Sequence, residues 1–171
     1  VENSISGRDF GVGIRIFDGF NAVYGYTNDA SEENLIEVAK EIALALKSKK
    51  TDIVLNLMKS DTRNLNPIKI IPSTVDKAKK VELLKRGYES AKNYDSLITQ
   101  VTTDYFDEEQ NVLIANSEGL MVEDKRVRTR FYVQSVASKD GEMQGGFYAP
   151  GASMGFEFFD GIDVDEVGKE A

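Results

Sequence analysis

The sequence predicts an α+β fold: one curved antiparallel sheet, made of an N-terminal hairpin and a C-terminal meander, with two main helices packed on one face. Three patterns support this prediction. Apolar residues alternate near the N-terminus, recur at three- and four-residue steps in two later segments, and alternate again through most of the second half. The chain has 171 residues, of which 41% are hydrophobic and 29% charged. This length and composition are typical of a globular protein, and we expect a single domain over residues 1–171.

The first element is expected to be a hairpin within residues 11–27. Its first strand carries alternating Val12, Ile14 and Ile16, and Asp18-Gly19 follows. An Asp-Gly pair between apolar runs favours a type I′ turn, which needs positive φ at both central residues. The hairpin is therefore centred on this pair.

Two amphipathic helices are expected next. The first runs from about residue 32 to about residue 48, with Ser31 as its N-cap and glutamates in its first turn. The second is expected to be capped by Ser73, and Gly87 inside it costs roughly 1 kcal/mol relative to alanine. Its apolar stripe consists of Val81, Leu84, Tyr88 and Ala91. Between the helices, residues 53–57 form either a short strand or irregular chain, and residues 64–72 form a connector.

The second half reads as a meander of four strands. Alternation begins at Leu97, and turns are expected at residues 107–109, 117–119 and 139–141. The longest strand is expected over residues 127–138. One face of that strand carries Val127, Thr129, Phe131, Val133 and Ser135. Residues 156–159 are expected to continue as strand.

Composition excludes several kinds of chemistry. The chain has no histidine and no cysteine, which removes the commonest general base, the commonest zinc ligand and all thiol chemistry. We assign no catalytic residue and no metal ligand to it. A net charge of −8 argues against binding to nucleic acid or to an anionic membrane. No apolar run is long enough to span a bilayer, and we expect a cytoplasmic protein.

Four charged or motif-bearing segments have both a chemical and a structural interpretation. Residues 151–155 match G-x-S-x-G, but without a histidine they are better explained as a glycine-rich loop. The acidic residues between 160 and 166 fit a helix start better than a calcium loop. Those between 104 and 109 could supply paired carboxylates to a glycoside hydrolase, although solvated turn charges are the simpler explanation. The basic residues between 125 and 130 are best explained as the polar outer face of a strand.

A glycine-rich segment between residues 145 and 155 has the strongest indication of a functional role. Glycines flanked by aromatic residues often mark a bend or a close approach of another chain to the backbone. The candidates for the edge of a substrate cleft are Gly145, Gly146, Phe147, Gly151 and Gly155.

The order of these motifs resembles the TldD/PmbA metalloprotease family, also described as modulators of DNA gyrase. The resemblance starts with the glycine-rich hairpin at residues 11–15, Gly25-Tyr26-Thr27-Asn28-Asp29 and the Ser31-capped helix. It continues through Ser117-Glu118-Gly119, Gly145-Gly146 and residues 155–159, the last of which is similar to the TldD branch. The resemblance covers nearly the whole chain. It implies that the chain is the N-terminal domain of a longer protein and that the C-terminal metal-binding domain is absent from it.

The resemblance implies a role without catalysis in this chain. Intact family members hold zinc on an H-E-x-x-x-H helix, and no position here matches any of those ligands. The domain would contribute to a homo- or heterodimer and form the wall of a cleft for unfolded or precursor peptides, with zinc bound elsewhere in the intact protein. The alternative is a stand-alone interaction module without enzymatic activity.

Overall fold

A computed structural model describes residues 3–46, 55–60 and 65–171. The chain divides into two compact units, Val1–Val54 and Leu55–Ala171, whereas the sequence predicts a single domain over residues 1–171. We describe each unit by itself.

The first unit contains a hairpin and one helix. Strands β1 (Val12–Asp18) and β2 (Asn21–Thr27) pair antiparallel, with Asp18 opposite Asn21. The hairpin is confirmed, but the expected turn type is wrong. Gly19 has a φ of 58° and Phe20 has no positive φ, so the two-residue turn fits type II′, in which only the first central residue needs that conformation.

Helix α1 (Glu32–Leu46) packs against this hairpin. The hydroxyl of Ser31 accepts a hydrogen bond from the backbone N–H of Asn34 at 3.4 Å, which confirms the N-cap. The two elements approach closely at Gly25, where a Cβ would lie 2.9 Å from the side chains of Val38 and Ile42. The expected end of the helix at residue 48 lies outside the described residues.

The second unit is built around one long strand, β5 (Leu120–Lys139). Strand β4 (Ile98–Ala115) pairs antiparallel along one side of it, and three shorter strands pair along the other side. These are β3 (Met58–Lys59, parallel), β7 (Gly151–Ala152) and β6 (Glu142–Tyr148), the last two antiparallel. The α+β class is confirmed, although the hairpin and the meander form separate sheets.

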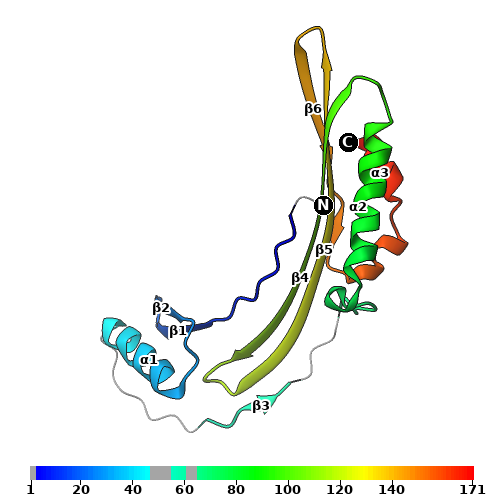
Figure 1. The fold of residues 1–171 in the computed structure, drawn as a ribbon. Helices are drawn as coiled ribbons and strands as arrows, with labels where there is room; N and C mark the ends of the chain where they lie inside the picture. The colour runs from blue at the N-terminus through cyan, green and yellow to red at the C-terminus, as the bar shows by residue number, and fades with distance from the viewer. Residues whose placement is uncertain (1–2, 47–54, 61–64) are drawn as a thin grey trace. The chain divides into compact units, whose positions relative to one another are not determined.

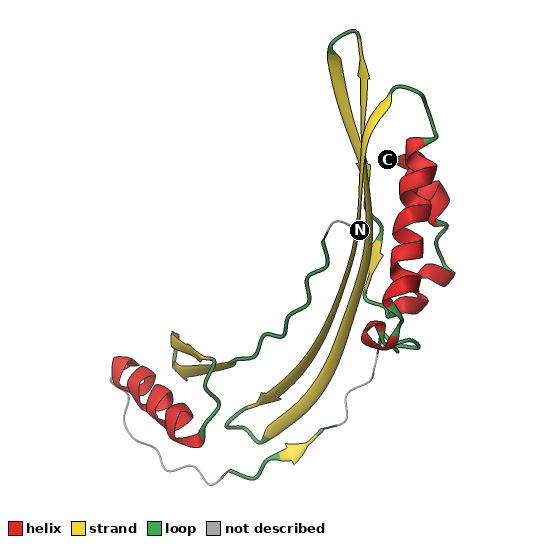
Figure 2. Ribbon diagram, viewed as in Figure 1, coloured by secondary structure: helices red, strands yellow, loops and turns green. Residues whose placement is uncertain are grey.

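Helices cover one face of this sheet. Helix α2 (Lys77–Lys92) lies along β4 and β5 with α3 (Val164–Glu170) beside it, and two 3₁₀ turns, η1 (Pro72–Thr74) and η2 (Phe156–Asp160), flank them (Figures 1 and 2). No described helix of Leu55–Ala171 lies on the other face, which we call the open face.

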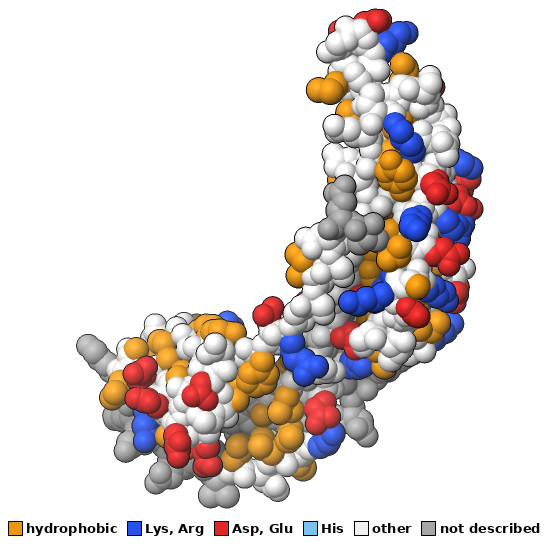
Figure 3. Space-filling view, in the orientation of Figure 1, with side chains coloured by type: hydrophobic (Ala, Val, Ile, Leu, Met, Phe, Trp, Pro, Cys, Tyr) orange, Lys and Arg blue, Asp and Glu red, His pale blue; other side chains and the backbone are white. Residues whose placement is uncertain are grey.

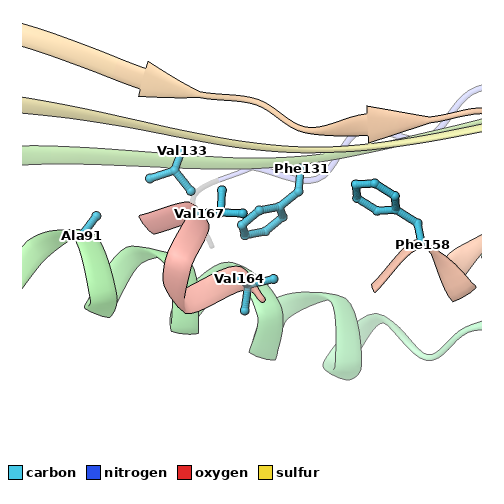
Figure 4. Close-up of a cluster of buried hydrophobic side chains, with 6 residues drawn as sticks. All are labelled: Ala91, Phe131, Val133, Phe158, Val164 and Val167. Carbon is cyan, nitrogen blue, oxygen red and sulfur yellow. The ribbon is translucent and has the colours of Figure 1, made fainter. Parts of the chain in front are cut away.

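The core lies between β5 and the two helices. The predicted alternation on β5 is confirmed, because Val127, Thr129, Phe131, Val133 and Ser135 are all buried. The buried cluster joins β5, α2, α3 and η2 (Figure 4). Its members are Ala91, Phe131, Val133, Phe158, Val164 and Val167. At Gly87 a Cβ would lie 2.8 Å from the ring of Phe131, so close helix–sheet packing requires the glycine.

Three local predictions are wrong. No turn interrupts residues 107–109, because β4 continues through them and its acidic side chains are held by cations from α2 and β5. Asp76, not Ser73, caps α2, accepting from the N–H of Ala78 at 2.9 Å. Residues 156–159 form η2 instead of a strand. Turns at residues 117–119 and 139–141 are confirmed, the second with φ of 54° at Asp140 and 86° at Gly141.

Within the described ranges, no helix combines the length and apolar character needed to cross a membrane.

Candidate functional site

The glycine-rich candidate segment forms the β6 and β7 side of the sheet. Gly145, Gly146 and Phe147 lie on β6, which pairs with the C-terminal half of β5. Gly151 starts β7 opposite Arg130, and Gly155 precedes η2. Four of the five candidates therefore lie next to β5 in one sheet, and Gly155 is buried at its border.

This chain's own backbone approaches two of the candidate glycines closely. A Cβ at Gly146 would lie 2.5 Å from the carbonyl oxygen of Ala171, and one at Gly155 would overlap the carbonyl oxygen of Ile70. At Gly145, by contrast, the nearest atom is the carbonyl oxygen of Ser135 at 3.7 Å, an ordinary contact. Internal packing thus explains Gly146 and Gly155 but not Gly145. A role of this segment toward substrate stays a prediction.

The open face carries aromatic side chains around an arginine. Because alternate residues of β5 point into the core, Arg130, Tyr132 and Gln134 point to the open face. Phe106 of β4 is paired with Arg130, and Phe147 of β6 with Gln134. The rings of Tyr132 and Phe147 stack with centroids 5.9 Å apart, and Phe106 and Phe147 are 54% and 65% exposed.

Glu157 is a buried carboxylate that the sequence did not predict as part of a site. Its Oε1 accepts hydrogen bonds from the N–H groups of Lys69 and Gly155, both at 3.1 Å, and its Oε2 accepts one from Ile70 at 2.8 Å. Burial raises the pKa of Glu157, but these backbone hydrogen bonds lower it more, so the pKa lies below its ordinary value. The side chain therefore fastens residues 69–70 to the start of η2. The only sequence signal was a lone glutamate within an aromatic run.

The acidic residues of β4 are held by separate cations. Lys80 pairs with Asp107 at 2.6 Å, and Arg128 pairs with Glu108 at 3.0 Å. Glu109 accepts from the N–H of Ser73 at 2.9 Å and faces Lys125 at 3.6 Å. Burial raises the pKa of Glu109, but the hydrogen bond from Ser73 and the charge of Lys125 lower it by more, so the pKa lies below its ordinary value. These carboxylates stabilise the packing of β4, which disfavours the glycoside hydrolase interpretation.

The other motif-bearing segments have structural roles as well. Asp163 caps α3 by accepting from the N–H of Asp165, whose carboxylate pairs with Arg86 at 2.7 Å. Glu166 pairs with Lys169 at 2.6 Å. Figure 3 shows acidic and basic side chains interspersed over the α2 and α3 surface. Ser153 of the G-x-S-x-G match lies in the loop between β7 and η2, in a chain without histidine.

Within the part of the chain that the structure describes, no set of ligands fits a catalytic transition metal. The chain has neither histidine nor cysteine, and among residues 3–46, 55–60 and 65–171 no three acidic side chains gather around a common point. Because carboxylates alone suit hard cations such as calcium and magnesium, a zinc ion does not fit the residues present.

Two family models match the chain, and their boundaries follow its two units. The PmbA/TldA metallopeptidase domain 1 matches residues 1–46, and the PmbA/TldA metallopeptidase central domain matches residues 70–171. The chain is thus built from two domains of a metallopeptidase class. It belongs to the PmbA/TldD family, which confirms the resemblance drawn from the sequence.

Curated relatives match almost the whole chain but are much longer. A metalloprotease of Methanothermobacter thermautotrophicus is 28% identical over 169 residues, which is 96% of this chain and 36% of the relative. A metalloprotease TldD homolog of Buchnera aphidicola is 24% identical over 179 residues, or 99% of this chain and 36% of the relative. The chain therefore spans about a third of the length of these relatives.

Solved structures share the fold. A proposed modulator of a DNA gyrase from Thermotoga maritima has a TM-score of 0.69 at 19% identity, over 94% of this chain and 36% of that one. A proposed modulator of DNA gyrase from Bacteroides thetaiotaomicron has a TM-score of 0.73 at 16% identity, over 94% and 38%. The two likenesses establish the fold alone.

Proposed function

We propose that this chain is the non-catalytic N-terminal part of a cytoplasmic, TldD-like zinc metallopeptidase that degrades or processes unfolded or precursor peptides. Its own contribution is to form the wall of the substrate cleft and to supply dimer contacts. The observation that carries the proposal is the combination of metallopeptidase-family domains with a complete lack of histidine and cysteine. A chain of this kind can hold and orient a peptide, while the metal is bound outside it.

The outer edge of β6 supports a role in binding extended peptides. The two-residue turn at Asp140-Gly141 makes Lys139 and Glu142 a hydrogen-bonded pair. From there along β5 and β6, non-hydrogen-bonded pairs alternate with hydrogen-bonded pairs. Met143, Gly145 and Phe147 consequently direct their N–H and C=O groups away from β5. Among the described residues no strand pairs with that edge, and every residue of β6 is exposed. An extended peptide can be added there through its backbone, whatever its sequence.

Gly145→Val tests this role without disturbing the fold. Its Cβ meets only the oxygen of Ser135 at 3.7 Å, so the variant folds. The valine side chain projects onto the open face beside the edge and fills the space that the glycine leaves for a side chain of the added peptide. We expect the whole protein to hydrolyse unfolded casein, to lose this activity with a zinc chelator, and to be slowed at least severalfold by the substitution. Lys139→Val, on the neighbouring strand at the turn, is the matched control. Unchanged hydrolysis by Gly145→Val contradicts the cleft role, and peptide binding without any hydrolysis favours the interaction module.

The first unit supports the dimer contacts. Alternate residues of its hairpin pack on α1, and the opposite side leaves Phe17, Tyr24 and Tyr26 between 55% and 67% exposed. Tyr24 and Tyr26 lie over Gly13 and Gly11, which makes this surface flat and aromatic. Light scattering on the whole protein should give a dimer, and Phe17→Ser with Tyr24→Ser should weaken it. A monomeric wild type would rule out homodimerisation.

A further inference from the structure

Arg130 differs from the three basic residues that precede it on β5. Lys125 pairs with Glu109, Arg126 with Asp124 and Arg128 with Glu108. Arg130 makes no ion pair and no hydrogen bond with any residue that the structure describes, and it is exposed on the open face. Among the four basic residues between positions 125 and 130 of β5, Arg130 is therefore the one whose charge no carboxylate of the described residues neutralises.

The neighbours of Arg130 form a surface suited to a peptide side chain. Phe106 lies directly across on β4, and Tyr132, stacked on Phe147, follows two residues along β5. On the other side of Arg130 stands Gly151, where a Cβ would lie 3.2 Å from the Cγ of the arginine. The missing side chain leaves the aliphatic part of Arg130 uncovered on that side. An arginine between exposed rings offers a planar fork for a carboxylate beside an apolar surface.

We propose that the open face binds an acidic side chain of an extended peptide at Arg130. The side chain two residues along that peptide, apolar or aromatic, then rests on the Tyr132–Phe147 stack. Alternate side chains of an extended chain are ~6.6–6.8 Å apart, which matches the spacing from Arg130 to Tyr132 on β5. The open face continues in both directions from Arg130, so it suits an internal acidic residue better than a chain terminus. This inference rests on the proposed function and deepens it, because it gives a sequence preference to a stretch of peptide that lies on the open face, apart from any strand added at the outer edge of β6.

Two labelled peptides test the preference. Both are fluorescein-labelled, acetylated and amidated decapeptides of serine and threonine, one with a central Glu-Ser-Phe and the other with Gln-Ser-Phe. Binding to the whole protein is followed by fluorescence anisotropy with a chelator present, which prevents cleavage. We expect the glutamate peptide to bind about fivefold more tightly at low salt, as for one partly exposed charge pair, with the difference shrinking as salt is added.

Three variants assign the preference to Arg130. Arg130→Gln should remove the discrimination, and Arg130→Glu should reverse it in favour of a Lys-Ser-Phe peptide. Lys139→Gln changes the net charge by the same amount at an exposed site at the far end of β5, and it should leave the discrimination intact. Circular dichroism verifies that each variant folds.

The outcomes separate this inference from the proposed function. Equal binding of both peptides by the wild type, or discrimination that survives Arg130→Gln, overturns the Arg130 assignment and leaves the peptidase proposal standing. Binding of neither peptide overturns both. A glutamate preference without casein hydrolysis supports Arg130 and overturns the peptidase proposal.

Discussion

Glu157→Gln tests the most unusual interaction in the second unit. The carboxylate is 3% exposed and accepts three backbone hydrogen bonds, two at Oε1 and one at Oε2. In the amide, one oxygen can still accept from Lys69 and Gly155, but the new NH₂ group faces the N–H of Ile70. One charge-assisted bond is lost and a buried donor is left unpaired, at a cost of about 2 kcal/mol.

Urea unfolding measures this cost. The chain has no tryptophan, so far-UV circular dichroism is the appropriate signal. With a slope of about 2 kcal/mol/M, the midpoint of Glu157→Gln should fall by about 1 M. The matched control is Glu123→Gln, because Glu123 is 59% exposed in its pair with Lys59 and its removal should shift the midpoint by less than ~0.3 M.

The pH dependence supplies an independent check. Because the folded pKa of Glu157 lies below the ordinary value of 4.5, its stabilisation is fully present above that value and is lost as pH falls through the folded pKa. The difference between wild type and Glu157→Gln should therefore be largest near neutrality and shrink below about pH 4.5. Equal midpoints at neutral pH, or a difference that grows in acid, would refute the reasoning.

Three further variants test the packing around β5. Gly87→Ala places a Cβ 2.8 Å from the buried ring of Phe131. Overpacking costs about 1–3 kcal/mol, which should exceed the gain of about 1 kcal/mol in helix propensity. The thermal midpoint of this variant should therefore fall. Gly141 has a φ of 86°, and a Cβ there would have no atom within 4 Å. Gly141→Ala should therefore lower the free energy of unfolding in urea by about 1 kcal/mol through backbone strain alone, and an unchanged free energy would contradict the turn geometry. Thr129→Val removes the hydroxyl that donates to the carbonyl of Met154 at 3.0 Å; a loss of about 1 kcal/mol is expected, and unchanged hydrogen exchange at residues 152–156 would argue against this contact.

Local patterns were sufficient to predict the elements that depend on nearby residues. The alternation on β5 follows from its buried and exposed faces, and Asp140-Gly141 adopts positive φ at both positions as a tight hairpin turn requires. Ser31 caps α1 through a contact three residues away. In each case the cause lies within a few residues of the effect.

The errors arose where distant residues decide the structure. Asp107 was assigned to a turn because it lies in an acidic run, but Lys80 from α2 holds it within β4. Glu157 owes its burial to backbone groups at residues 69–70, almost ninety positions away. For the candidate site, the sequence shows a row of glycines, but only tertiary structure separates Gly146, which lies against the carbonyl oxygen of Ala171, from Gly145, which has room for a side chain. The isolation of Arg130 is equally invisible in sequence, because it depends on which of its neighbours are already paired.

If these 171 residues bind peptide without holding the catalytic metal, as we propose, their metal content should differ from that of the whole protein. Metal analysis of purified residues 1–171 beside the whole protein, both after dialysis against trace zinc, tests it most directly. We predict about one zinc per chain in the whole protein and far less than stoichiometric zinc in residues 1–171. Stoichiometric zinc retained by residues 1–171, together with hydrolysis of casein by that fragment alone, would contradict the account.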